Sequence, residues 1–409
     1  MSGDVTLASL DDLPEPAPIA AFLEKGIGWL VEAQHPDGGW GAGSHARQQE
    51  RDPHAIQTDP ATTAFTALAL IRAGHTPVLG EYREAVRRAV EYLVKVVDGY
   101  PREGPRITDR KGTQLQAKLG PLVDTLLTVQ LLSRVLPELG DGDELRGRVD
   151  KALDRCLEKL QGSQKADGSW GGGGWAPVLQ SSLGCSALEL AQVAGKRIAP
   201  RFLDSARNYQ KSNFSVSTGK AMATDAAGVE LYAFAGSQRA AANEARAASF
   251  LIEDAKKVGD LARDAEVTTE NLAAIGVGGG KARALYRAYA GNEAQVARLD
   301  DEAMLKGFGN NGGEEYLSYA MTSESLVIAG GEPFEKWNRK MRERLEKVQS
   351  PDGSWTGHHC ITSPVFCTAA VVQCLTVDRD ARLLRRISDI VVASAREAPK
   401  EAPKEAQGK

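Results

Sequence analysis

The sequence of 409 residues has few aromatic residues, few cysteines and no long apolar run. Nowhere do eighteen consecutive residues lack charge and strong polarity, so we expect no transmembrane segment. The N-terminus, MSGDVTLASLDDLPEPAPIAAF, is acidic and rich in proline, whereas a secretory signal requires a positive start and then an apolar stretch. The five cysteines form an odd, unpatterned set that is typical of reduced thiols. These features predict a cytoplasmic protein.

Neither sign of charge is in large excess. Lys and Arg total 50 against 54 for Asp and Glu, which gives a net charge of -4, and no basic run extends beyond a few residues. We therefore expect no nucleic-acid partner, because nucleic-acid binding requires a concentrated positive surface. The apolar share of 42% is that of a globular protein with a large core.

Strand signals are scarce, and helical periodicity runs through most of the chain. Charged amphipathic segments such as 81–97 alternate with Ala- and Leu-rich segments such as 61–73, which are apolar nearly all round. Ala-Gly pairs that could end the apolar helices occur at 73–74, 194–195, 235–236, 290–291 and 329–330. Inner helices are therefore predicted to end near 74, 136, 195, 236, 291, 330 and 376. This spacing predicts stacked helical hairpins.

Closing such an array into a ring would bury the apolar helices on all sides. The sequence therefore predicts an all-α fold, an α/α toroid of about six to seven hairpins. We expect an acidic, Pro-rich segment at 1–18, the toroid domain at 19–395 and a disordered tail at 396–409, where Glu-Ala-Pro-Lys repeats.

Three heptapeptides share the pattern Gln-x-x-Asp-Gly-x-Trp, each after a charged helix and before an apolar one. Asp-Gly favours a turn with positive φ, the Gln amide can bond free backbone groups at a helix end, and the Trp ring can cover them. The pattern thus predicts a structural turn. Its residues are Gln34, Asp37, Gly38 and Trp40; Gln164, Asp167, Gly168 and Trp170; and Gln349, Asp352, Gly353 and Trp355.

These heptapeptides resemble the QW motifs of the terpene cyclase and prenyltransferase superfamily, which includes squalene-hopene cyclases. The segment TTAFTALAL at 62–70 is similar to the inner helices of that superfamily. The resemblance spans roughly residues 19–395, with degenerate copies at 198–330. It implies an α/α toroid with a central cavity for an isoprenoid or another hydrophobic ligand.

The resemblance also shows what is missing for cyclase chemistry. The family's Asp-x-Asp-Asp or Asp-x-Asp-Thr motif matches DPATTA, where Asp59 holds the first position and Ala61 stands in place of the proton donor. Alkene protonation requires a positioned acid, which alanine cannot supply. From the residues alone, Asp59 is expected to cap a helix that begins at Pro60.

The zinc ligands of protein prenyltransferases are matched only in part. Asp124 fits the first ligand, but Leu126 stands in the Cys position and Cys367 in the His position. His358, His359 and Cys360 lie nearby in sequence and, with Cys367, are candidates for another metal site. We predict no cofactor. The segment AIGVGGGKA at 274–282 departs from a phosphate-binding loop and is interpreted as a break between helices.

Two functional hypotheses remain. The first is an isoprenoid cyclase or prenyl transferase of divergent mechanism, and the second is a non-catalytic toroid that serves protein interaction or scaffolding. Catalytic candidates for the first are Asp59, Asp124, Asp225 and Tyr316, and Cys185 also lies on a predicted inner helix. The sequence leaves open whether the partner is an isoprenoid or a protein.

Overall fold

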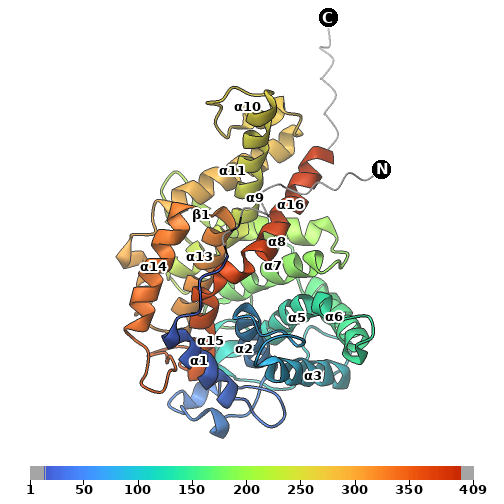
Figure 1. Cartoon of the computed structure of the whole chain (residues 1–409), viewed down its shortest axis with the longest axis vertical. Helices are drawn as coiled ribbons and strands as arrows, with labels where there is room; N and C mark the ends of the chain where they lie inside the picture. The colour runs from blue at the N-terminus through green and yellow to red at the C-terminus, as the bar shows by residue number, and fades with distance from the viewer. Residues whose placement is uncertain (1–12, 14, 398–409) are drawn as a thin grey trace, which may run out of the picture.

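The computed structural model describes residues 13 and 15–397, and the chain is mostly helical (Figure 1). Most of the predicted N-terminal segment, 1–18, lies outside the described residues. The predicted tail, 396–409, lies almost entirely outside them as well. One small antiparallel pair, β1 (Phe214–Ser215) and β2 (Lys220–Ala221), interrupts the helices. Short 3₁₀ turns are η1 (His45–Arg47), η2 (Pro53–Ala55), η3 (Leu136–Glu138) and η4 (Val377–Asp380).

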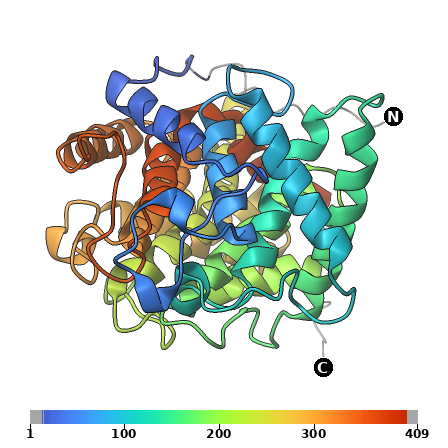
Figure 2. The same ribbon diagram turned by 90° about the horizontal axis from the view of Figure 1, so that it is seen from below.

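Six inner helices form a closed ring. They are α2 (Pro60–Arg72), α5 (Val123–Val135), α7 (Pro177–Val193), α9 (Glu230–Val258), α13 (Gly313–Ala329) and α15 (Pro364–Leu375). Each packs against the next in this order, and α15 packs back against α2. In Figure 2 the chain colours run around the ring and return red beside blue. The α/α toroid predicted from the sequence is therefore confirmed.

The outer helices pack against the inner ones as hairpin partners. They are α1 (Ala21–Glu32), α3 (Arg83–Gly99), α6 (Glu144–Gly162), α8 (Pro200–Ser212), α11 (Gly279–Val296) and α14 (Glu332–Glu346). The last helix, α16 (Ala381–Glu397), packs on α9, α13 and α7. Short helices α4 (Gln114–Lys118), α10 (Thr269–Ala274) and α12 (Glu302–Leu305) lie in the connections.

The far parts of α9, α11 and α16 project from the ring with α10 (Figure 1). They enclose a small apolar cluster of their own, which includes Leu251, Leu272, Leu285 and Val392. The break predicted at 274–282 is confined to residues 275–278, which join α10 to α11 as a turn, while 279–282 already belong to α11. No helix in the described part of the chain is long and apolar enough to cross a membrane.

Two of the five Ala-Gly pairs do not end a helix, which corrects the predicted inner helices ending near 236 and 291. Gly236 lies inside α9, where a Cβ atom would collide with Ser182 and Gln210, so this glycine allows close helix packing. Gly291 lies inside the outer helix α11, and nothing in the structure explains it. At 74, 195 and 330 the glycine follows the helix with positive φ, as predicted.

Each heptapeptide forms a turn between an outer and an inner helix. The indole N–H of the Trp donates to a Leu carbonyl near the end of the preceding outer helix, and the Trp backbone N–H donates to a hydroxyl of the following inner helix. The indole bonds are Trp40 to Leu30 (2.7 Å), Trp170 to Leu160 (2.9 Å) and Trp355 to Leu345 (2.7 Å). The hydroxyls belong to Thr63, Ser181 and Thr368.

The glutamine of each heptapeptide reaches a third element, the first turn of the next outer helix. Its amide donates both to the carbonyl of the turn glycine and to a carbonyl of that helix. The second acceptors are Ala85 in α3 (2.8 Å), Phe202 in α8 (2.9 Å) and Phe22 in α1 (2.7 Å). The turn glycines have φ of +87°, +90° and +101° and abut the same helices. Each turn therefore ties two outer helices to one inner helix.

Candidate functional site

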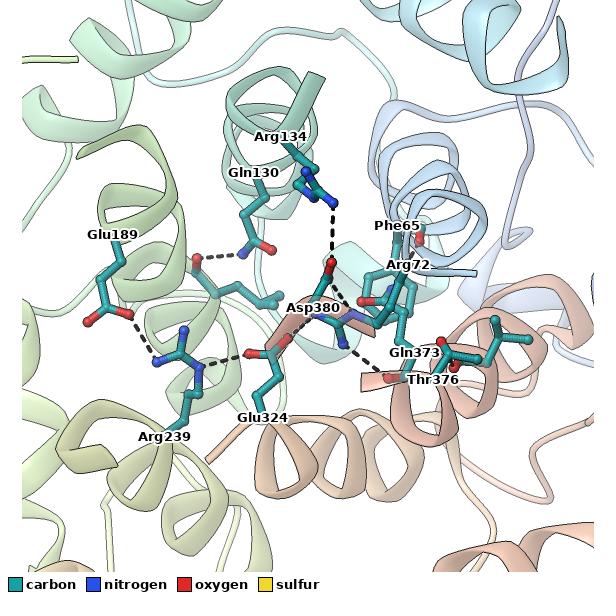
Figure 3. Close-up of polar contacts among 12 residues, drawn as sticks. Phe65, Arg72, Gln130, Arg134, Glu189, Arg239, Glu324, Gln373, Thr376 and Asp380 are labelled. Carbon is teal, nitrogen blue, oxygen red and sulfur yellow. Dashed lines mark hydrogen bonds and ion pairs between the residues drawn. The ribbon is translucent and has the colours of Figure 1, made fainter. Parts of the chain in front are cut away.

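A chain of buried and half-buried charges crosses the centre of the ring (Figure 3). Eight residues of alternating sign pair at 2.6–3.3 Å, each with the next: Glu138, Arg134, Asp380, Arg72, Glu324, Arg239, Glu189 and Arg207. They come from α2, α5, α7, α9 and α13, with outer helix α8 and turns η3 and η4. Arg72 also donates to the Gln373 carbonyl of α15 (3.1 Å), so the charge chain contacts all six inner helices.

The pairing keeps these groups ionised despite their burial. Burial alone would raise the pKa of the Glu324 carboxyl, but the charges of Arg72 and Arg239 hold it below its usual value. The pKa of Asp380 is lowered against the effect of burial by Arg72 and Arg134. Since positive and negative members are equal in number, the charge chain is neutral as a whole.

The space left beside the charge chain is small. The central cavity measures about 40 Å³ and is lined by Arg72, Arg134, Arg239, Glu324 and Asp380 together with apolar side chains such as Phe65. Pockets that hold small molecules measure roughly 300–1,000 Å³. The predicted central cavity for an isoprenoid is therefore filled by protein, with room for water-sized guests.

Asp59 and Asp124 lie together at the opposite ends of the inner helices, where the long connecting loops gather. Asp59 caps α2 as predicted, and its carboxylate accepts from the backbone N–H of Thr62 (2.8 Å) and Ala42 (3.0 Å). Asp124, in the first turn of α5, accepts from the backbone N–H of Ala61 (3.1 Å) and from the Gln116 amide (2.7 Å). Two residues far apart in sequence thus form one buried carboxyl pair.

Burial raises the pKa of both carboxyls. Burial, and next the charge of Asp59, raise the pKa of Asp124 to about 7. The pKa of Asp59 is also raised by burial, which its hydrogen bonds from Thr62 and Ala42 oppose. Near neutral pH this pair can hold a proton, which is what a general acid requires.

A second carboxyl pair, Glu314 and Glu315, lies in the first turn of α13. Glu315 accepts from the Tyr232 hydroxyl (2.7 Å) and from the backbone N–H of Phe308 (2.9 Å). Glu314 accepts from the Ile361 N–H (3.1 Å), but its second oxygen is buried without a partner. Burial, and next the charge of Glu315, raise the pKa of Glu314 to about 8.

The other predicted catalytic residues do not join these pairs. Asp225 accepts from the Tyr209 hydroxyl (2.6 Å) beside the second heptapeptide turn. Tyr316 is buried on α13 with its ring edge-on to Tyr319. Burial raises the pKa of the Tyr316 phenol above its usual value. Cys185 is buried on α7, and burial raises the pKa of its thiol to about 12.

The predicted metal ligands do not converge on one point, and each makes contacts of its own. His358 is exposed, His359 faces the Asn310 carbonyl (3.2 Å), and the Cys367 thiol faces the Ile361 carbonyl (3.7 Å). Cys360 is buried, and burial, and next the charge of Glu314, raise the pKa of its thiol to about 12. Within residues 13 and 15–397, no three His, Cys, Asp or Glu side chains are grouped to hold a metal ion.

Sequence reasoning missed the charge chain and the Glu314–Glu315 pair. A signal was present, because Arg72 and Glu189 are each the single charged residue in an inner-helix segment that otherwise carries no charge. A charge in such a position must be paired once it is buried. Which residues pair could not be read from the pattern, since the partners lie on helices that meet only in the ring.

Comparisons with known proteins agree with this fold. A family model described as the squalene-hopene cyclase C-terminal domain matches residues 4–104. No curated protein matches the chain significantly. The family match and the ring of hairpins support a terpene cyclase-like superfamily for this chain.

Several solved structures are similar over most of the chain. A variant of the type II terpene cyclase MstE from Scytonema, in complex with geranylgeranyl dihydroxybenzoate, is 14% identical with a TM-score of 0.48, covering 88% of this chain and 97% of MstE. Another MstE variant, in complex with merosterolic acid A, is 14% identical with a TM-score of 0.47, covering 88% and 96%. A polysaccharide lyase is 12% identical with a TM-score of 0.40, covering 88% and 98%.

Proposed function

We propose that this chain is a terpene cyclase-like toroid with a non-catalytic function, serving as a protein-interaction or scaffold toroid. The observation that carries the proposal is the charge chain at the centre of the ring. It occupies the place where an isoprenoid would lie, and it leaves about 40 Å³. Carbocation chemistry needs apolar and aromatic walls, whereas in this space paired Arg and carboxylate groups share the lining with apolar side chains.

The geometry also favours a structural use of the centre. A buried ion pair stabilises little on balance, but breaking one is costly because an unpaired charge remains. A charge chain that joins all six inner helices therefore penalises any opening of the ring. A rigid ring presents its outer helices and loops in fixed positions, as a scaffold requires.

The test is a binding and conversion assay on purified protein. Squalene and geranylgeranyl diphosphate are incubated with the protein, and native mass spectrometry and product analysis follow. We expect neither a stoichiometric complex in the centre nor a cyclic product. A cyclic product, or a bound isoprenoid whose affinity changes in the Phe65→Trp variant, which narrows the central cavity, would overturn the proposal.

One observation favours a second candidate, acid catalysis at the loop end of the ring. Asp124 accepts the backbone N–H of Ala61, the residue in the family's proton-donor position, and its pKa of about 7 allows it to carry a proton. In this alternative Asp124 is the general acid, and the nearby charge of Asp59 helps to keep its pKa raised. Asp124→Asn would then abolish turnover of an alkene substrate, while Asp225→Asn, outside the carboxyl pair, would leave it intact.

A further inference from the structure

A surface pocket of about 330 Å³ opens on the loop side of the ring, within the size range of small-molecule sites. Its two walls are residues 43–57 and 110–113. Backbone hydrogen bonds join the walls, from the His45 N–H to the Gly112 carbonyl (2.9 Å) and from the Gln114 N–H to the Gly43 carbonyl (2.9 Å). The pocket is therefore preformed.

The pocket carries an excess of positive charge. Arg47, Arg110 and Lys111 line it, against Glu50 alone. The Glu50 carboxylate accepts from the backbone N–H groups of the two residues that follow it (3.0 and 3.1 Å). Within the described part of the chain, none of the three cations forms an ion pair with a carboxylate, although paired cations are common elsewhere on this protein.

One cation is fixed in place. Arg110 donates from Nη1 to the Gln57 side chain (2.6 Å), an uncharged acceptor, and forms no direct ion pair; its charge acts on Asp59 only at longer range. The Arg110 carbonyl accepts from the Gln116 amide (2.9 Å), and the same amide donates to Asp124 (2.7 Å). The positive pocket thus lies on the outer side of the Asp59–Asp124 pair, connected to it through one side chain.

We propose that this pocket binds a phosphorylated anion, a phosphate or diphosphate group held by Arg47, Arg110 and Lys111. Arginine forks match the geometry of phosphate oxygens, and lysine adds a compact positive charge. The volume accommodates a diphosphate together with part of a larger molecule. The site is independent of the proposed function, because a scaffold or an enzyme could carry it.

Isothermal titration calorimetry of the full chain with inorganic pyrophosphate tests the site at low ionic strength. We expect millimolar or tighter binding, weakened at least tenfold in the Arg47→Gln/Lys111→Gln double variant. Lys151→Gln, an exposed cation on α6, is the matched control and should leave the affinity unchanged. Glu50→Gln should strengthen binding, because it removes the opposing charge. This gain cannot result from misfolding.

Further titrations with ADP and with geranylgeranyl diphosphate identify the source of the anion. Tighter binding of either one than of pyrophosphate would assign the rest of the ligand, and equal binding of all three would assign the free anion. Absence of pyrophosphate binding, or equal binding by the wild type and the double variant, would overturn the proposal.

Discussion

Asp124 Oδ1 accepts the backbone N–H of Ala61 at 3.1 Å, so a carboxyl group from the next inner helix lies directly at the position where the resemblance requires an acid. Alanine at position 61 therefore does not leave that position without a carboxyl neighbour. The central cavity, at the other ends of these helices beside the charge chain, measures about 40 Å³.

This relationship predicts the outcome of restoring the missing acid. Ala61 is fully buried, and Ala61→Asp would place a third carboxyl beside Asp59 and Asp124. We expect neither the wild type nor this variant to convert squalene, and we expect the variant to be less stable because a buried carboxyl must be accommodated. Gas chromatography of long incubations and thermal melting measure the two effects. Hopene-type product from the variant would show that the centre opens in solution.

The free energy of unfolding should depend on pH through Glu314. Its pKa is raised from 4.5 to about 8, so the folded protein keeps a proton that the unfolded chain releases. Between about pH 4.5 and pH 8 the unfolded state binds fewer protons, and the contribution of Glu314 to stability therefore falls as pH rises. Urea denaturation across this range should show the decline. Glu314→Gln should reduce its slope without abolishing it, because the raised pKa of Asp124, about 7, acts in the same direction.

Glu84→Gln is the control for this measurement, since Glu84 is an exposed residue of α3. Its pH profile should follow that of the wild type. If the Glu314→Gln profile also follows the wild type, Glu314 is not the group that carries the buried proton.

Breaking the charge chain should be costly. Arg239 pairs with both Glu189 and Glu324, and its side chain is 3% exposed. Arg239→Met should lower the free energy of unfolding by about 3–5 kcal/mol, because two buried carboxylates lose a partner. Arg344→Met, which removes a surface ion pair with Glu302, should cost about 1 kcal/mol or less.

A double variant distinguishes lost pairing from lost packing. Arg239→Met combined with Glu324→Gln should be less destabilised than the two single changes added together, because one unpaired charge is removed with its partner. Strict additivity would mean that the ion pair itself contributes nothing.

The heptapeptide turn predicts a large loss from one aromatic ring. Trp170 is 1% exposed, and its indole bonds the Leu160 carbonyl while its ring packs on Gly184. Trp170→Ala should lower the free energy of unfolding by about 3–5 kcal/mol. Gly184→Ala should also destabilise, because its Cβ would lie 2.6 Å from the ring. An unchanged melting temperature in both variants would contradict the structural role of the turn.

The sequence predicted the ring well because its signals are local. Helix type follows from the width of the apolar face, and Asp59 before Pro60 identified a helix start that the structure confirms. The predicted helix ends at 236 and 291 were wrong. An Ala-Gly pair looks the same in the sequence whether its glycine ends a helix or lies inside one. Gly236 serves packing against Ser182, which belongs to another hairpin.

The site was predictable only in part. Asp59 and Asp124 were each singled out by position in an inner helix, and their meeting follows from the neighbouring places of α2 and α5 in the ring. The pairing of Arg72 with Asp380, 308 residues away, depends on where the last turn of the chain crosses the ring. The local sequence around either residue does not indicate a partner so far away along the chain.

The third heptapeptide turn affects how the protein is made. Gln349 bonds the Phe22 carbonyl across 327 residues, and α15 packs on α2. The first hairpin therefore gains its second neighbour only after nearly the whole chain has left the ribosome. Until then one side of the apolar helix α2 has no partner, and exposed apolar surface of this kind favours aggregation of the nascent chain. During synthesis, the first hairpin therefore needs protection from aggregation until the last hairpin has been made and packs against it.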